Sequence, residues 1–219
     1  CLGHHLAILS SGTANVYIDG FNFYYRCVKG TPYKWLNPAV LAAILLPKEQ
    51  IKRIRYYTAR VSARPSDPDI PRRQQVYLRA LETLPNLTIT FGHFLTNVVR
   101  MPLAYPPATG PKFAHVIRTD EKGSDVNLAS HLLLDAFRQD CDLALVISND
   151  SDLAEPIRIA RQEFGLRVGL GLPVSGTESI TLVNVVDFWR RIRLGQLKAS
   201  QFPDSMSDAA GTFSKPATW

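Results

Sequence analysis

The sequence predicts an α/β fold: a three-layer sandwich in which helices cover both faces of a mainly parallel central sheet. Short β-prone runs alternate with helical patterns along most of the chain, as in proteins built from βαβ units. Residues 143–148 (LALVIS) form a continuous apolar run, which is typical of a parallel strand covered on both faces. The chain also contains no internal repeat and no coiled-coil heptads.

Local patterns place the individual elements. A helix beginning at Asn37 has an N-cap residue, a proline at its first position and Pro47 as a stop, and Gly165 ends another helix. The proline-rich stretch 100–111 predicts a loop or flap. Strands are expected at residues 15–18, 51–61, 87–95, 113–119, 143–148 and 167–172, and helices at 37–46, 72–84, 124–138, 154–164 and 187–193.

Length and composition predict one sizeable domain. The 219 residues are 46% hydrophobic and 20% charged, which is ordinary globular usage and argues against wholesale disorder. We expect the domain to span residues 14–194. Residues 1–13 are expected to be an expression scar or a disordered start, and residues 195–219 an irregular C-terminal tail.

Several classes of protein are disfavoured by the sequence. Three scattered cysteines do not make a disulfide framework or a cysteine zinc site, and they suit a reducing compartment. No apolar run approaches the roughly 18 residues of a membrane span. Phosphate-binding glycine loops, GxGxxG fingerprints and GxSxG elbows are absent from the sequence. We therefore expect a cytoplasmic protein without a membrane partner.

Positive charge is concentrated in the first half of the chain. The formal net charge is +6 at pH 7, and residues 1–110 carry 13 basic and 5 acidic side chains. A cationic surface attracts a polyanion such as RNA without reading its sequence. A merely solvated, unevenly charged surface explains the same composition, so charge leaves both interpretations open. The arginines expected to follow a phosphate backbone are Arg60, Arg64, Arg72 and Arg73, with Arg53 and Arg55 as further candidates.

Acidic residues stand where the predicted strands end. Asp19 directly follows the first strand, Asp150 and Asp152 follow the LALVIS strand, and Asp125 lies in the first turn of the longest helix. The carboxyl ends of parallel strands share one edge of a sheet, and this edge holds the functional crevice. Clustered carboxylates repel one another unless a cation neutralises them, and Mg²⁺ or Mn²⁺ prefers such oxygen ligands. The four acids therefore predict a metal site suited to attack of water on a phosphodiester.

Each of these residues also has a purely structural explanation. Asp19 can belong to an ordinary turn, Asp125 can favour the positive end of a helix dipole, and Asp150 or Asp152 can cap a helix. It is their coincidence at one predicted edge that favours a metal site.

Three polar residues near these acids are expected to support the site. Asn22 can orient a carboxylate or cap a helix, Lys122 can touch phosphate or remain solvated, and Ser148 can fix the Asp150 loop or satisfy a strand-end amide. The aromatic group Phe21, Phe23, Tyr24 and Tyr25 is expected in the core, with stacking of one ring on a base as the alternative.

Three segments resemble the NYN domain family, whose members are relatives of PIN-domain nucleases. They are VYIDGFNFYY from Val16, KGSDVNL from Lys122 and VISNDSDL from Val146, in the order in which the family has them. The resemblance covers about residues 14–190. It implies a Rossmann-like PIN fold, metal-dependent ribonuclease activity, and Asp19, Asp125, Asp150 and Asp152 as the acidic positions, supported by Asn22. Family members often have glycine where this chain has Asn149, and asparagine tolerates a left-handed backbone.

We accordingly expect a Mg²⁺- or Mn²⁺-dependent endoribonuclease whose substrate is RNA. A second copy of the chain and a regulatory protein stay open as further partners. A non-catalytic RNA-binding module with the same fold is the main alternative. A phosphatase acting on small molecules is disfavoured, because the first strand ends in Asp19-Gly20-Phe21 and lacks a DxD arrangement.

Overall fold

The computed structural model describes residues 12–219. The segment expected to precede the domain, 1–13, lies outside the described residues except for its last two positions. None of the helices from residue 12 onward combines the length and apolar character that a membrane crossing requires.

A six-stranded sheet forms the centre of the fold, and every neighbouring pair of its strands runs parallel. This confirms the predicted α/β sandwich with a parallel sheet. All five residues of the LALVI strand are buried, as its unbroken apolar character predicts. In sheet order the strands are β3 (Leu87–Phe91), β2 (Gln50–Thr58), β1 (Thr13–Asp19), β6 (Leu143–Ile147), β7 (Arg167–Leu172) and β8 (Phe188–Arg191).

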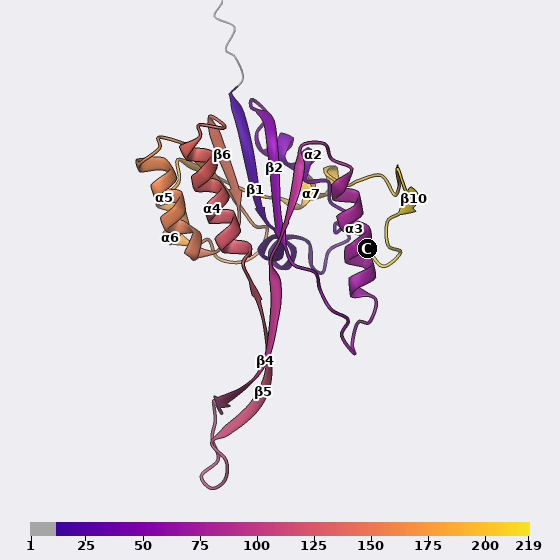
Figure 1. Ribbon diagram of the computed structural model, residues 1–219, viewed down its shortest axis with the longest axis vertical. Helices are drawn as coiled ribbons and strands as arrows, with labels where there is room; N and C mark the ends of the chain where they lie inside the picture. Colours follow the sequence, from indigo (N-terminus) through magenta and orange to yellow (C-terminus); the bar gives the residue numbers. More distant parts are fainter. Residues whose placement is uncertain (1–11) are drawn as a thin grey trace, which may run out of the picture.

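Helices cover both faces of this sheet (Figure 1). On β1, Val16 and Ile18 point into a core shared with α2 and α3, whereas Tyr17 points into the core beneath α4 and α5. Asn37 caps α2 through its side chain, as predicted. The helices are α1 (Gly20–Phe23), the π-helix η1 (Tyr24–Val28), α2 (Pro38–Leu45), α3 (Ile70–Glu82), α4 (Ser124–Phe137), the 3-10 helix η2 (Ser151–Leu153), α5 (Ala154–Gln162), α6 (Ile180–Val183) and α7 (Leu194–Ala199).

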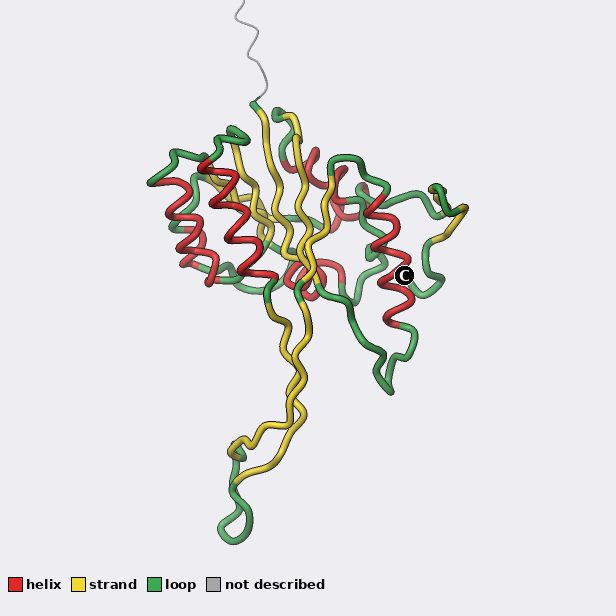
Figure 2. The backbone as a smooth tube through the Cα atoms, in the orientation of Figure 1, coloured by secondary structure: helices red, strands yellow, loops and turns green. Residues whose placement is uncertain are grey.

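A long antiparallel hairpin projects from the body of the protein (Figure 2). It consists of β4 (His93–Pro102) and β5 (Phe113–Lys122), and we call it the arm. The sequence predicted one strand over residues 87–95, but the chain leaves the central sheet at Gly92 and continues as the arm. The predicted loop 100–111 accordingly begins later, because β4 extends to Pro102.

Two expectations for the C-terminal part of the chain are wrong. Residues 187–193 do not form a helix, since β8 instead adds a sixth strand, where the Phe188 ring fills the space above Gly169. The tail from Gly195 is not irregular. It contains most of α7 and a hairpin of β9 (Ser205–Asp208) and β10 (Gly211–Ser214), and Trp219 packs against Tyr77 with ring centroids 5.7 Å apart.

A buried ion pair joins the sheet to α4. Asp135, which is 2% exposed, accepts hydrogen bonds from Arg55 Nε at 2.9 Å and Arg55 Nη2 at 2.8 Å. Its second partner is the Tyr17 hydroxyl, which donates at 2.8 Å. Burial and the neighbouring Asp135 carboxylate together raise the pKa of Tyr17 and keep it protonated as a donor.

We expect Asp135→Ala to lower the free energy of unfolding by about 3–5 kcal/mol, because it leaves the Arg55 guanidinium without its buried partner. The matched control is Glu155→Ala, which breaks the exposed pair with Arg158 and should cost much less stability, because solvent screens that pair. Urea denaturation measures both values. Equal losses in the two variants would show that the buried network has no special weight.

We expect the arm to be dispensable for folding. Replacing residues 98–117 by a short glycine-containing turn removes the part of the hairpin that extends away from the central sheet, so the free energy of unfolding should change by less than about 1 kcal/mol. Urea denaturation of the shortened protein tests this. A loss of cooperative unfolding would mean that the arm supports the body.

Candidate functional site

The candidate site begins at the carboxyl end of β1, where Asp19 is held in place on both oxygens. Asp19 is 5% exposed. The Ser148 hydroxyl donates to its Oδ2 at 2.9 Å, and the backbone N–H of Asn22 donates to its Oδ1 at 3.0 Å. Burial raises the pKa of Asp19, the two hydrogen bonds oppose that rise, and the negative charges of Asp150 and Glu121 add to it.

Backbone geometry requires a glycine directly after Asp19. A Cβ on Gly20 would lie 2.5 Å from the carbonyl oxygen of Tyr57 and 2.8 Å from the Tyr56 ring. The close approach between the end of β1 and the end of β2 therefore depends on the missing side chain. It also sets the direction in which Asp19 leaves the strand.

Ser148 and Asn22, which hydrogen-bond to Asp19, also hydrogen-bond to the loop after β6. Ser148 Oγ accepts from the Asp150 backbone N–H at 3.1 Å, and the Asn22 side-chain oxygen accepts from the Asn149 N–H at 3.2 Å. Asp150 Oδ1 accepts from the Asp152 N–H at 3.0 Å, so Asp150 caps the turn that follows. The predicted supporting residues Asn22 and Ser148 thus link the two strand ends.

Asn149 departs from the expectation based on left-handed geometry. Within residues 12–219 the non-glycine residue with positive φ is Gln139, not Asn149. The Asn149 side chain instead donates to the Thr177 carbonyl at 2.9 Å and accepts from the Ser179 N–H at 2.8 Å. It therefore fastens the β6 loop to the segment after β7.

Asp125 completes the cluster from the first turn of α4. Its pKa is raised to about 6, mainly by burial and then by the negative charges of Asp19, Asp150, Glu121 and Asp152. Asp125 is therefore repelled by all three other predicted acids and by Glu121. We call Asp19, Glu121, Asp125, Asp150 and Asp152 the acidic cluster.

Glu121 is a member that the sequence analysis missed. It lies near the end of β5, and its Oε1 accepts from the Ser124 hydroxyl at 2.8 Å and from the Ser124 N–H at 3.3 Å. The feature of the sequence that could have identified Glu121 is its position three residues before the first residue of the longest helix. It was overlooked because the predicted strand ended at residue 119, three residues before the end of β5.

The donor chemistry of the acidic cluster suits a hard divalent cation. All five members are carboxylates, and none of them forms an ion pair with a side chain in the described part of the chain. As the side chains are oriented, however, no three His, Cys, Asp or Glu residues among positions 12–219 converge closely enough to grip a metal ion. Binding would therefore require rotation of members that are less buried than Asp19.

The predicted basic residues lie outside the cluster. Lys122 Nζ is 3.7 Å from Asp120 Oδ2 rather than beside Asp125. Arg55 cannot follow a phosphate backbone, since its guanidinium is bound to Asp135. The four main candidates follow β2 or begin α3: Arg60 donates to Gln75, Arg64 lies in the intervening loop, Arg72 is exposed, and Arg73 pairs with Asp67.

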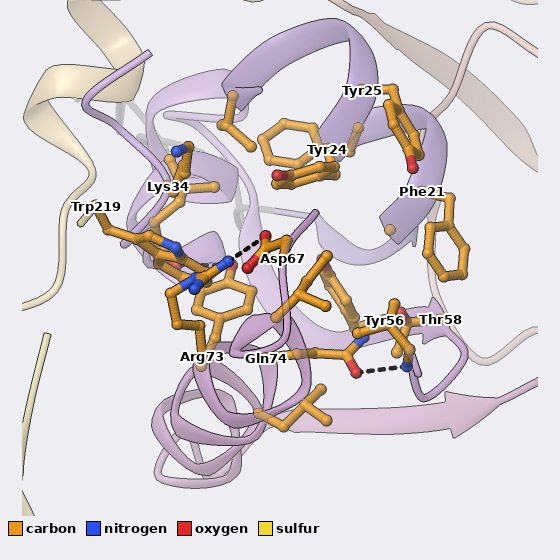
Figure 3. A pocket seen from close by; sticks show the side chains of 18 of the residues that line it. Phe21, Tyr24, Tyr25, Lys34, Tyr56, Thr58, Asp67, Arg73, Gln74 and Trp219 are labelled. Carbon is orange, nitrogen blue, oxygen red and sulfur yellow. Dashed lines mark hydrogen bonds and ion pairs between the residues drawn. The ribbon is translucent and has the colours of Figure 1, made fainter. Parts of the chain in front are cut away.

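A pocket of about 320 Å³ lies beside the end of β2, where Tyr56 and Thr58 line it (Figure 3). Gly20 and Phe21, the two residues that follow Asp19, also line it. Its walls are largely aromatic, and Lys34, Arg64 and Arg73 contribute positive charge; the aromatic lining residues are Phe21, Phe23, Tyr24, Tyr25, Tyr56, Tyr77 and Trp219. Of the aromatic group predicted to lie in the core, Phe23 is buried, whereas Tyr25 is 49% exposed.

Comparison with known proteins identifies the family, because the NYN domain model matches residues 13–190. The chain belongs to the NYN domain family. This confirms the resemblance carried by the three sequence motifs. NYN domains are a PIN-like nuclease family, in agreement with the parallel sheet and its acidic edge.

Two individual proteins are similar to this chain. The 6-hydroxy-3-succinoylpyridine 3-monooxygenase HspA of Pseudomonas putida is 31% identical over 234 residues, which cover 93% of this chain and 74% of that protein. A protein of unknown function from Vibrio parahaemolyticus has a solved structure that matches with a TM-score of 0.56 and 15% identity, over 89% of this chain and 98% of that one. The second likeness concerns the fold alone.

The acidic cluster predicts an unusual pH dependence for the metal-free protein. Asp125 has a pKa of about 6 when folded, against about 3.9 for an unfolded aspartate, so the folded state binds its proton more tightly. Between these two pH values this group's contribution to stability is therefore lost as pH rises. In EDTA, we expect Asp125→Asn to be more stable than the wild type at pH 7, because it lacks the repelled charge. On acidification the wild type should gain stability as Asp125 takes up its proton, and the variant should gain less.

Urea denaturation at several pH values between these limits makes the measurement, with Glu163→Gln at the exposed residue directly after α5 as the matched control. The control should follow the wild-type curve. If Asp125→Asn follows it too, Asp125 does not experience the repulsion described above.

Proposed function

We propose that this protein is a metal-dependent endoribonuclease. The observation that carries the proposal is the acidic cluster, in which carboxylates from β1, β5, α4 and the β6 loop lie close enough to repel one another. None of them forms an ion pair with a residue from 12 to 219. Membership of the NYN family supports phosphodiester chemistry at this edge, because NYN nucleases typically use divalent metals.

Asp19, Asp125 and Asp150 would hold Mg²⁺ or Mn²⁺, with Asp152 as a further ligand, directly or through water. When bound, such an ion activates a water molecule and neutralises charge on the phosphate. Ser148 and the backbone N–H of Asn22 would orient Asp19, because each donates a hydrogen bond to one of its two carboxylate oxygens. Arg60, Arg64, Arg72 and Arg73 would hold the RNA backbone beside β2 and α3, and Lys122 lies exposed at the base of the arm.

We expect Asp150→Asn to reduce metal-dependent cleavage of RNA by at least about 100-fold while leaving the fold intact, because it removes a ligand charge from the rim of the cluster. The assay uses labelled single-stranded and structured RNA with Mn²⁺, Mg²⁺ or EDTA, and circular dichroism checks folding. Asp69→Asn, an exposed aspartate before α3, is the control and should cleave like the wild type.

Equal cleavage by Asp150→Asn and the wild type would overturn the assignment. RNA binding with steep salt dependence and no metal-dependent product would instead support the non-catalytic RNA-binding module. Turnover of a small phosphate ester, with RNA left unchanged, would support a phosphatase.

Hydroxylation of a heteroaromatic compound is the second candidate function. HspA is named for a monooxygenase reaction on a substituted pyridine, and it matches 93% of this chain. The specific structural observation in favour is the aromatic pocket beside Asp19, which can accept a flat ring. Monooxygenation consumes O₂ and two electrons, so the discriminating assay follows O₂ uptake with 6-hydroxy-3-succinoylpyridine and reduced nicotinamide or flavin. Uptake that depends on the pyridine would favour this function.

A further inference from the structure

The aromatic pocket contains two kinds of group that the acidic cluster does not use: ring faces and cations. Its volume of about 320 Å³ lies at the lower end of the range for ligand pockets, roughly 300–1,000 Å³. This size suits one small ring compound or one nucleotide unit. A pocket walled by aromatic rings and containing a few convergent polar groups is a typical binding site for such a ligand.

Rings approach the space from two sides. The η1 turn presents Tyr24 and Tyr25, whose ring centroids are 5.3 Å apart. Single π-helical turns such as this one are frequent at functional sites. A second aromatic wall comes from Tyr77, which meets Tyr56 at 6.3 Å and Trp219 at 5.7 Å, so these rings brace one another. Figure 3 shows Tyr24 and Trp219 on different sides of the pocket. A flat ligand entering between the two walls would find ring faces and edges on both sides.

Positive charge is in excess at the same place. Asp67 accepts from Arg73, and its pKa is lowered first by that hydrogen bond and then by the charges of Arg73, Arg64 and Lys34. Three cations therefore surround this carboxylate, and Asp69 is the other acid near Arg73. Neither Lys34 nor Arg64 forms an ion pair with any residue from 12 to 219. An anion could therefore be bound beside the rings.

The amide of Gln74 in the pocket lining is already engaged. Gln74 donates to the Ala59 carbonyl and accepts from the Val61 N–H, both at 2.9 Å. The charged groups left for recognition beside the aromatic surface are the ammonium of Lys34 and the guanidinium of Arg64. These groups select a ring that carries a negative charge rather than an uncharged ring or a free anion.

We infer that the pocket binds a flat heteroaromatic ring bearing an anionic group, with the ring between Tyr24 and the Tyr77–Trp219 wall and the anion at Lys34 and Arg64. Two sources have this chemistry: a nucleotide of an RNA chain and a free heteroaromatic acid. The RNA form rests on the proposed nuclease function, since it would place one base next to Asp19. The binding of a ring with an anion stands without it.

Calorimetric titration of the full chain tests the inference with two matched sets of probes. Adenosine 5′-monophosphate is compared with adenosine and with inorganic phosphate, and nicotinate is compared with nicotinamide. In at least one set the charged ring should bind about tenfold or more tightly than the uncharged ring, and phosphate alone should bind more weakly still. Preference for the nucleotide points to RNA, and preference for nicotinate points to a small molecule.

Two variants and one control locate the binding. Tyr24→Leu, which keeps apolar bulk but loses the ring face, should weaken the preferred probe about 10-fold or more, in line with measured base stacking. Lys34→Met should abolish the preference for the charged ring. Lys29→Met removes a lysine that stacks on Tyr25 outside the pocket and should bind like the wild type. Thermal unfolding confirms that each variant is folded.

The outcomes separate this inference from the nuclease proposal. Asp150→Asn should bind the probes normally even though cleavage is lost. Binding without RNA cleavage by the wild type would keep the pocket assignment and remove the nuclease. Absence of binding by any charged ring, or unchanged binding by folded Tyr24→Leu and Lys34→Met, would overturn the pocket assignment whatever the nuclease assay shows.

Discussion

The structure is organised around a concentration of negative charge that the described chain does not neutralise. The parallel sheet delivers the carboxyl ends of β1 and β6 to one edge, and α4 begins at the same edge. Asp19 and Asp125 both have raised pKa values there, each mainly because of burial and further because of neighbouring carboxylates. Holding such groups together costs stability, and the rigid strand ends with their hydrogen bonds to Ser148 and Asn22 supply the restraint.

Several acids elsewhere in the protein form ion pairs with arginines, whereas those of the acidic cluster form none with the described residues. Asp187 and Asp208 have lowered pKa values because arginines bind them, and the pKa of Asp208, beside Arg79, falls to about 2. Asp135 is more buried than Asp19, yet it receives both Arg55 and Tyr17. The fold therefore pairs acids where they serve structure. It leaves them unpaired at the sheet edge where family membership expects phosphodiester chemistry.

The sequence predicted those parts of the fold that depend on local pattern. The LALVIS run predicted a buried parallel strand and so placed Asp150 at a strand end, and the β-prone run 15–18 did the same for Asp19. The Asn37-Pro38 pair predicted the start of α2. Glu121 was missed because its role depends on where the arm returns to the body, which local propensity does not encode. The order of the C-terminal segment was missed for a similar reason. Trp219 packs against Trp35 and Tyr77, which are far away in the sequence, and a polar, proline-containing segment has no hydrophobic periodicity that predicts such contacts. The pocket likewise exists only once η1, β2 and α3 are assembled.

Asp19 lies between two chemically distinct regions, and this arrangement explains how one family fold can agree with two functional proposals. On the β6 side its neighbours are carboxylates, which suit a cation and a phosphodiester. On the β2 side the chain passes through Gly20 into rings and cations, which suit a charged heteroaromatic compound. The Asp19 charge reaches across this boundary, because burial first and then Asp19 raise the pKa of Tyr56 in the pocket wall. The two regions use different side chains, so Asp150 and Tyr24 can be changed one at a time, and the two proposals can be tested separately.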